Sequence, residues 1–217
     1  MIANIEGLGR LMAYVVSDSR GDIEFRDRAG FEEAMAGADP AATVAELSWS
    51  DDDPDVSRTE LCEVRTADDW PYVVEAVRRH VRTMFMQGDC WHLALALNRL
   101  YGLGLAAVVN RHPDGRESVS HVAAALPDGG FLDVRGYLAS EQDVSREGTN
   151  WRDHYVRPVS REEIVAILDG YAEENGGAAV DWEDPDAYPF AWQAELVARI
   201  LLEEEAEGAR PKSAPAR

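Results

Sequence analysis

The sequence predicts a mixed α+β fold in which a cysteine-bearing helix packs on an antiparallel sheet that carries a histidine and an aspartate. Three observations support this fold class. Apolar residues recur at helical spacing from Cys90 to Leu100, strand-like runs follow at 103–111, 118–126 and 131–138, and turn-forming residues separate these runs. Hydrophobic residues make up 46% of the 217 residues, which is enough for a buried core.

The pattern divides the chain into four expected segments. Residues 1–65 form a small α+β lead-in packed on the core, and residues 66–170 form the core itself. Residues 171–208 form a C-terminal helical segment, and residues 209–217 form a disordered tail.

The lead-in alternates strand-like runs with turn signals. The expected elements are strands at 12–18 and 22–27, a short helix at 31–37, and strands at 43–50 and 59–65. The first two strands flank Ser19-Arg20-Gly21 and are expected to form a hairpin. The acidic stretch 51–57 is expected to be a loop.

Helices and a polar loop flank the three core strands. The spacing of apolar residues predicts an amphipathic helix over 66–86, and residues 139–155 are expected to form a polar loop. A helix over 159–170 should begin at a capping box made by Ser160 and Glu163 and end at Gly170. A last helix is expected within 191–208.

Charge and cysteine content limit the classes of partner. The formal net charge is −20, so nucleic acid and anionic membrane surfaces are not expected as partners because both would be repelled. The N-terminal stretch lacks the features of a secretion signal, and no apolar run is long enough to span a membrane. With only two cysteines there is no disulfide framework, and a cytoplasmic location is expected.

Cys90 begins the apolar pattern of its helix. Cys90, Leu93, Leu97 and Leu100 fall on one helical face, so the sulfur is expected to lie beside whatever that face packs on. A helix N-terminus favours a thiolate, whereas Asp89, the expected N-cap, brings a negative charge that opposes one.

His121 and Asp133 are placed symmetrically about a turn. The turn Pro127-Asp128-Gly129-Gly130 separates the two strands, and Pro127 lies midway between the two residues. An odd loop would pair His121 directly with Asp133 across the strands and on one face, together with Val119. Such a carboxylate can orient an imidazole. A thiol, a base and an orienting acid are the parts of an activated nucleophile.

These residues resemble those of a known superfamily. Gln87-Gly88-Asp89-Cys90-Trp91 at a helix start, with His121 and Asp133 on the next two strands, is similar to the papain-like cysteine protease superfamily in its compact, transglutaminase-like form. Papain itself places its histidine on the order of 130 residues after the cysteine, whereas 31 residues separate the two here. No subfamily is singled out.

The resemblance implies a fold and a chemistry. It implies a papain-like core in which Cys90 is the nucleophile, His121 the base and Asp133 the orienting residue of a hydrolase or acyltransferase acting on an amide, peptide or thioester carbonyl. Gln87 and the backbone N–H of Cys90 are candidates for holding the oxyanion. We expect no metal and no cofactor. The alternative function is a non-enzymatic protein-binding or regulatory module on the same scaffold.

Several other residues have two interpretations. Trp91, Trp151, Trp182 and Trp192 either line a substrate cleft or pack in the core. The other open assignments are Cys62 as a core residue, Arg135 as an ion-pair partner or a substrate-binding group, and His92 as a surface or supporting residue. A zinc site formed by Cys90, His92 and His121 lacks the usual ligand spacing.

Overall fold

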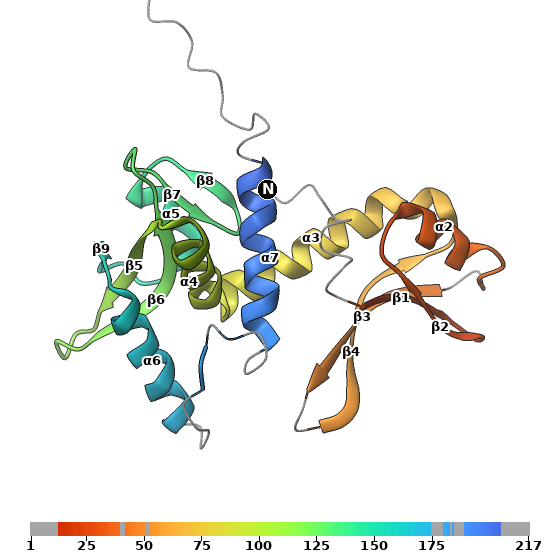
Figure 1. The fold of residues 1–217 in the computed structure, drawn as a ribbon, viewed down its shortest axis with the longest axis horizontal. Coiled ribbons are helices and arrows are strands. Elements are labelled where there is room, and N and C mark those ends of the chain that lie inside the picture. Colours follow the sequence, from red (N-terminus) through yellow and green to blue (C-terminus); the bar gives the residue numbers. More distant parts are fainter. Residues whose placement is uncertain are drawn as a thin grey trace, which may run out of the picture. The chain divides into compact units, whose positions relative to one another are not determined.

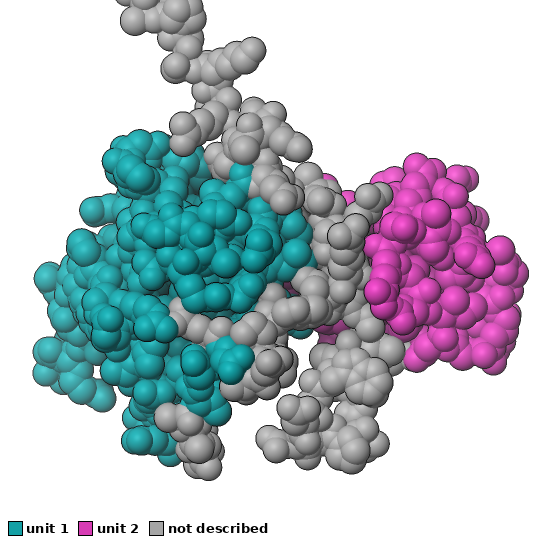
Figure 2. Space-filling view, in the orientation of Figure 1, with its two compact units in different colours: residues 1–2, 82–217 teal, residues 3–81 magenta. Residues whose placement is uncertain are grey.

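The computed structural model describes residues 13–39, 42–50, 53–174, 180–182, 184 and 189–204. The chain divides into two compact units, coloured separately in Figure 2: residues 3–81, and residues 82–217 together with the first two residues. The division falls inside a long helix, α3 (Trp70–Gln87), rather than after residue 65. The predicted α+β class is confirmed. Among the described helices, none has the length and apolar character needed to cross a bilayer.

The N-terminal unit is an antiparallel sheet with helices. The sheet has the order β2-β1-β3-β4. Its elements are β1 (Ala13–Asp18), β2 (Gly21–Phe25), α2 (Arg28–Met35), β3 (Ala42–Ser50), β4 (Asp53–Val64) and the 3-10 helix η1 (Ala67–Asp69), followed by α3. Phe25, Phe31 and Trp70 form an aromatic cluster in its core.

The hairpin, the short helix and the third strand of this unit were predicted from the sequence. The acidic stretch was predicted wrongly, because β4 already begins at Asp53 and pairs with β3 back to Ser50. Pairing with β3 satisfies the backbone of a segment whose composition favours a turn. The first twelve residues lie outside the described part of the chain.

The C-terminal unit is built on a second antiparallel sheet (Figure 1) with the order β8-β7-β6-β5-β9. Its strands are β5 (Gly104–Arg111), β6 (Glu117–Ala125), β7 (Phe131–Asp133), β8 (Gly136–Leu138) and β9 (His154–Pro158). Its helices are α4 (Cys90–Tyr101), α5 (Glu141–Gly148), α6 (Arg161–Glu174) and α7 (Pro189–Glu204).

Helices cover both faces of this sheet. On one face α4 and α6 pack over a cluster that includes Leu105, Ala107 and Val122. On the other face Val144 of α5 packs on Ala123 and its neighbours. Strand β5 is therefore buried on both sides, which explains its unbroken apolar run. Helix α7 packs against α4 (Figure 1).

Three predictions for this unit need correction. The run 131–138 is not one strand, because a tight turn at Val134 and Arg135 splits it into β7 and β8. The predicted polar loop 139–155 contains α5, capped by Ser140, and the start of β9. Helix α6 receives the predicted cap from Ser160 but continues past Gly170 to Glu174. The predicted tail at 209–217 lies outside the described residues.

Candidate active site

Cys90 is the first residue of α4, as the sequence predicted. The helix ends at Gly102, which adopts the left-handed conformation with φ 66° that glycine tolerates best. Every residue from Cys90 to Leu97 is buried, so the helix is apolar all round rather than along one stripe. His92 is therefore buried, which excludes the surface position and leaves the alternative of a supporting residue. Helix α7 and Trp182 lie against the side of α4 that the stripe left for solvent.

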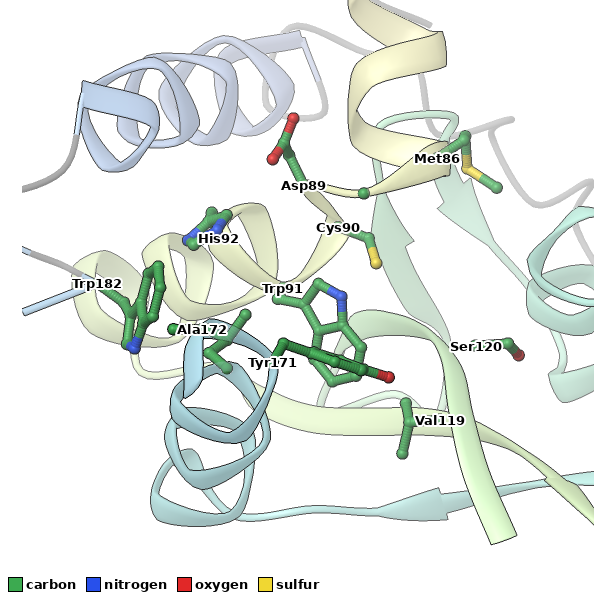
Figure 3. Close-up of a pocket in the computed structure, with 12 residues that line it drawn as sticks. Met86, Asp89, Cys90, Trp91, His92, Val119, Ser120, Tyr171, Ala172 and Trp182 are labelled. Carbon is green, nitrogen blue, oxygen red and sulfur yellow. The ribbon is translucent and has the colours of Figure 1, made fainter. Parts of the chain in front are cut away.

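Asp89 precedes the helix but does not cap it with its side chain. This corrects the prediction that its carboxylate would bond the first-turn N–H groups. Burial raises the pKa of Asp89 to about 6. In Figure 3 the carboxylate of Asp89 and the sulfur of Cys90 point in different directions from the start of α4. Near neutral pH the Asp89 carboxyl is therefore still largely ionised, but its negative charge is directed away from the sulfur.

A β-bulge at Ser120 puts Val119 and His121 on opposite faces of the sheet. Val109 pairs with Val119 and Val108 pairs with His121, so Ser120 is an extra residue in β6. Val119 consequently packs on the α4 side of the sheet, while His121 lies under Gly148 at the end of α5. The prediction that Val119 and His121 share a face was therefore wrong.

The hairpin register differs by two residues from the predicted one. Ala125 pairs with Phe131 and Ala124 with Leu132, so Ala123 rather than His121 would continue the pairing opposite Asp133. The turn is centred on Asp128, with Pro127 at its second position as predicted. His121 and Asp133 remain on one face, and their side chains reach each other diagonally.

The predicted histidine–aspartate contact is present. The Nε2 atom of His121 lies 2.9 Å from Oδ2 of Asp133, and both residues are buried, with exposed fractions of 0% and 2%. The carboxylate accepts a hydrogen bond from Nε2–H and so determines which ring nitrogen carries that proton. Nδ1 of His121 makes no conventional hydrogen bond within the described residues, and it is the ring nitrogen left for a thiol.

Arg135 holds the other side of Asp133. Its Nε donates to Oδ1 at 3.1 Å and to Oδ2 at 3.0 Å, and its backbone N–H donates to Oδ1 at 2.8 Å. The same guanidinium donates to the backbone carbonyls of Asp143 and Val144 in α5, each at 3.1 Å. Of its two interpretations, the structure supports the ion pair.

The charges of the site support one another. Burial acts to lower the pKa of His121, but hydrogen bonds and charge interactions with Asp133 and Cys90 outweigh it and raise this pKa to about 9. Burial acts to raise the pKa of Asp133, but His121 and Arg135 bring it down to about 2. Near neutral pH the His121 imidazole is therefore protonated and bound to the carboxylate of Asp133.

A pocket of about 560 Å³ lies beside Cys90 (Figure 3). Its walls come from the start of α4, the bulged part of β6, the C-terminal half of α6 and Trp182. The apolar side chains of these walls are Trp91, Val119, Leu168, Tyr171, Ala172 and Trp182. Cys90 is only 3% exposed, so its sulfur is reached through this pocket.

The pocket settles some predictions about aromatic residues. Trp91 lines it and packs edge-on against Tyr171, with ring centroids 6.2 Å apart. Trp182 also lines it and donates its indole N–H to Asp169 at 2.7 Å. Trp151 packs on His112 in a separate pocket. The side chain of Trp192 lies outside the described residues.

Sequence reasoning missed the contribution of α6 to the pocket. Leu168 and Tyr171 lie one turn apart on one face of this helix, but the helix was predicted to end at Gly170. It also missed Ser120, whose hydroxyl donates to the carbonyl of Val108 at 3.3 Å. The helical spacing of the α6 pair was a usable signal, whereas nothing in the local sequence marks the bulge.

Gln87, the possible metal ligands and Cys62 are the other site predictions from the sequence. The side chain of Gln87, a candidate for holding the oxyanion, lies outside the described residues, although its backbone ends α3 three residues before Cys90. No three His, Cys, Asp or Glu side chains within the described residues are grouped as metal ligands. Cys62 is a free cysteine of intermediate exposure in β4, in the other unit.

Comparison with known proteins adds no relative. No family model, no curated protein and no solved structure matches this chain. The chemistry of the site therefore has to be argued from its own geometry.

Proposed function

We propose that the C-terminal unit is a cysteine-nucleophile hydrolase or acyltransferase with a Cys90–His121–Asp133 triad. The observation that carries this proposal is the position of His121. One of its ring nitrogens is held by Asp133, and the other has no hydrogen-bond partner among the described residues. Cys90 contributes to the raised pKa of the ring and forms part of a pocket wall. A histidine with a purely structural role would not need an aspartate partner, coupling to a cysteine and a neighbouring pocket all together.

The roles of the three residues follow from their protonation. An imidazolium beside Cys90 favours a thiolate, which attacks the carbonyl carbon of an amide or thioester. His121 then gives its proton to the leaving nitrogen or sulfur, and Asp133 keeps the ring oriented and stabilises its positive charge. The backbone N–H of Cys90, at the N-terminus of α4, is the donor we assign to the oxyanion. Water or a second nucleophile then releases the acyl group and regenerates the thiol.

The scaffold proposed for this chemistry is the papain-like core in its compact, transglutaminase-like form. A cysteine at a helix start, packed against an antiparallel sheet that carries the histidine and the aspartate, supports it. The proposed substrates are proteins, peptides or other amides, and a cytoplasmic location belongs to the same proposal. Neither a metal ion nor an organic cofactor has a role in it.

Alkylation by iodoacetamide tests the activation of Cys90. Mapped by mass spectrometry near neutral pH, Cys90 should react faster than a free thiol, by about tenfold or more after correction for burial. His121→Gln should remove this excess. Cys62 in the same molecules provides the internal control, because it lies in the other unit and should react equally in both proteins.

Folding and chemistry can be separated in this experiment. Urea unfolding shows whether His121→Gln is folded, and Asp133→Asn provides a second variant that keeps the size of the side chain. A Cys90 rate equal to that of a free thiol, unchanged in both folded variants, would falsify the proposal. Mass-spectrometric detection of an acyl adduct on Cys90 after incubation with a cell lysate should then identify the substrate.

One observation favours a second candidate function. Cys90 is 3% exposed and His121 is fully buried, so the site presents little reactive surface. A non-enzymatic binding module would use the same pocket for recognition without chemistry. In that case Cys90→Ser would leave binding of the partner unchanged, whereas the enzyme would lose all turnover.

A further inference from the structure

The pocket beside Cys90 has one apolar and aromatic side, and the rest of its surface is polar. Trp91 and Tyr171 pack edge to face, and Trp182 is fixed by its hydrogen bond to Asp169. Leu168 and Val119 complete the apolar surface. Trp91 is held by the buried core of α4 and Trp182 by α6, so this part of the wall is already ordered before a ligand arrives.

The charged groups of the pocket have one sign. No lysine or arginine is among the described residues that line it. Burial lowers the pKa of His92 to about 4, so this histidine is neutral near neutral pH. Burial raises the pKa of Asp89 to about 6, and its carboxylate is therefore still largely ionised there. An anionic group entering the pocket would lose hydration and meet the carboxylate of Asp89, because the imidazolium of His121 is not part of this lining.

The volume suits a group of moderate size. About 560 Å³ lies within the range of roughly 300–1,000 Å³ that small-molecule pockets occupy. A single methyl or glycine-like group would leave most of this apolar wall in contact with water. An aromatic ring would cover it and could pack on Trp91 and Tyr171 in an edge-to-face or offset arrangement.

We propose that this pocket binds an aromatic group of the substrate next to the carbonyl attacked by Cys90, and that it rejects groups with a negative charge. This assignment rests on the proposed function for the identity of the reacting carbonyl. The preference for an aromatic group over an anionic one depends only on the aromatic side of the pocket and on the charge of Asp89.

Three chloroacetamides that differ in their N-substituent test the preference. The substituents are methyl, benzyl and para-carboxybenzyl, and the rate at which each alkylates Cys90 is read by mass spectrometry and divided by its rate with a free thiol. The benzyl reagent should react at least about tenfold faster than the methyl reagent, because burial of a ring stabilises its complex. The carboxybenzyl reagent should lose most of this advantage.

Cys62 is the internal control for the series. It lies outside the pocket, so its corrected rates with the three reagents should be equal. Asp89→Asn should narrow the gap between the benzyl and carboxybenzyl reagents. Asp114→Asn removes the same charge from the exposed loop between β5 and β6 and should leave that gap unchanged.

The outcomes separate this proposal from the proposed function. Equal corrected rates for methyl and benzyl at Cys90 would overturn the aromatic assignment, and equal rates for benzyl and carboxybenzyl would overturn the exclusion of anions. A benzyl preference in a protein whose Cys90 shows no excess over a free thiol would refute the catalytic triad and retain the pocket. If Cys90 reacted faster than a free thiol in a way that depends on His121, but showed no preference among the reagents, the catalytic triad would be retained and the aromatic pocket refuted.

Discussion

Arg135 links the acid of the candidate triad to the helix that covers the histidine. Its guanidinium binds both oxygens of Asp133 and two carbonyls of α5. The local sequence allowed Arg135 to be an ion-pair partner or a substrate-binding group. On a continuous strand, Arg135 would lie two residues from Asp133 on the same face. The turn between β7 and β8 instead folds Arg135 back on Asp133. The bidentate geometry makes Arg135 a positioning residue for the site.

Replacement of Arg135 should destabilise the C-terminal unit. In Arg135→Met the buried Asp133 loses its permanent charge partner, and we expect a loss of about 3–5 kcal/mol in the free energy of unfolding at neutral pH. Arg135 and His121 lower the pKa of Asp133, so the stability they provide is present above the unfolded pKa and is lost as the pH falls toward about 2. Urea unfolding of both proteins at neutral and acidic pH should show the difference shrinking on acidification.

Arg135→Lys separates charge from geometry in this test. Lysine keeps the positive charge but cannot bind Asp133 and the α5 carbonyls with one planar group, so its unfolding free energy should lie between those of the wild type and Arg135→Met. The interpretation would be wrong if Arg135→Met unfolded at the same urea concentration as the wild type.

Gly148 sets the space available to His121. A Cβ atom at this position would lie 3.0 Å from Cβ of His121. Gly148→Ala should therefore cost about 1–3 kcal/mol by overpacking, and it should slow alkylation of Cys90 by displacing the imidazole. Gly170→Ala is the matched control, since nothing lies within 4 Å of its Cβ position in α6, and it should stabilise the protein by about 0.5–1 kcal/mol. Equal effects of the two substitutions would contradict this account.

Helix α4 carries a partly buried carboxyl at its start, Asp89, which neither caps the helix nor forms an ion pair described above. Burial raises the pKa of Asp89 to about 6, so the folded state holds this proton more tightly than the unfolded state does. Stability should therefore fall as the pH rises from about 4 through about 6. In Asp89→Asn this loss is removed, and above that range the variant should be more stable than the wild type by about 3 kcal/mol.

The comparison of Asp89→Asn with the wild type has an internal check. Below about pH 4 both side chains are neutral, so the unfolding free energies from urea titration should converge. A constant difference at all pH values would show that the substitution acts through shape and not through charge.

Elements with a strong hydrophobic periodicity or a clear turn signal could be predicted from the sequence. Elements whose bounds depend on pairing with a distant strand could not. The start of α4 at Cys90, the turn at Pro127 and the cap at Ser160 follow from local chemistry. Helix α5 also carried a local signal, because Ser140 is followed by an acid three residues later, but the polar composition of the segment masked it. The extension of β4 into acidic sequence depends on β3, to which it pairs.

The sequence predicted which residues meet in the candidate site, but not how they are arranged. His121 and Asp133 do meet, but through a diagonal contact and a register shifted by two residues. An extra residue in β6 puts Val119 on the face opposite His121, and alternation of side chains along a sequence does not reveal a bulge. The contribution of α6 to the pocket could be seen only in the tertiary structure, because its residues follow Cys90 by about 80 positions in the sequence.

The stability of the protein should fall on the alkaline side through His121. Partners in the folded state raise its pKa to about 9, so its contribution is complete below the unfolded pKa of about 6.5 and is lost as the pH rises through about 9. The expected loss is on the order of 3 kcal/mol. Urea unfolding of the C-terminal unit over this range should show the decline, and His121→Gln should show a flatter profile.

Measurements on the whole molecule have to account for its net charge. At −20 the folded chain repels itself, and this repulsion grows with pH as further groups lose protons. Moderate salt screens exposed charges far more than it screens the buried pair of His121 and Asp133. A decline that disappears in salt would assign the alkaline effect to surface repulsion instead of to His121.

The number of residues between His121 and the turn determines on which side of the sheet the imidazole lies, because the bulge at Ser120 comes before this stretch. From the turn back to His121 the strand alternates regularly, and Ser120 then breaks the alternation once before Val119. Loss of a single residue between His121 and the turn would move the ring to the opposite side of the sheet, whereas loss of Ser120 would remove the bulge and leave the pairs Val108–His121 and Val109–Val119 in place. The two stretches of β6 therefore differ in the length changes they can tolerate, although they are consecutive in one strand.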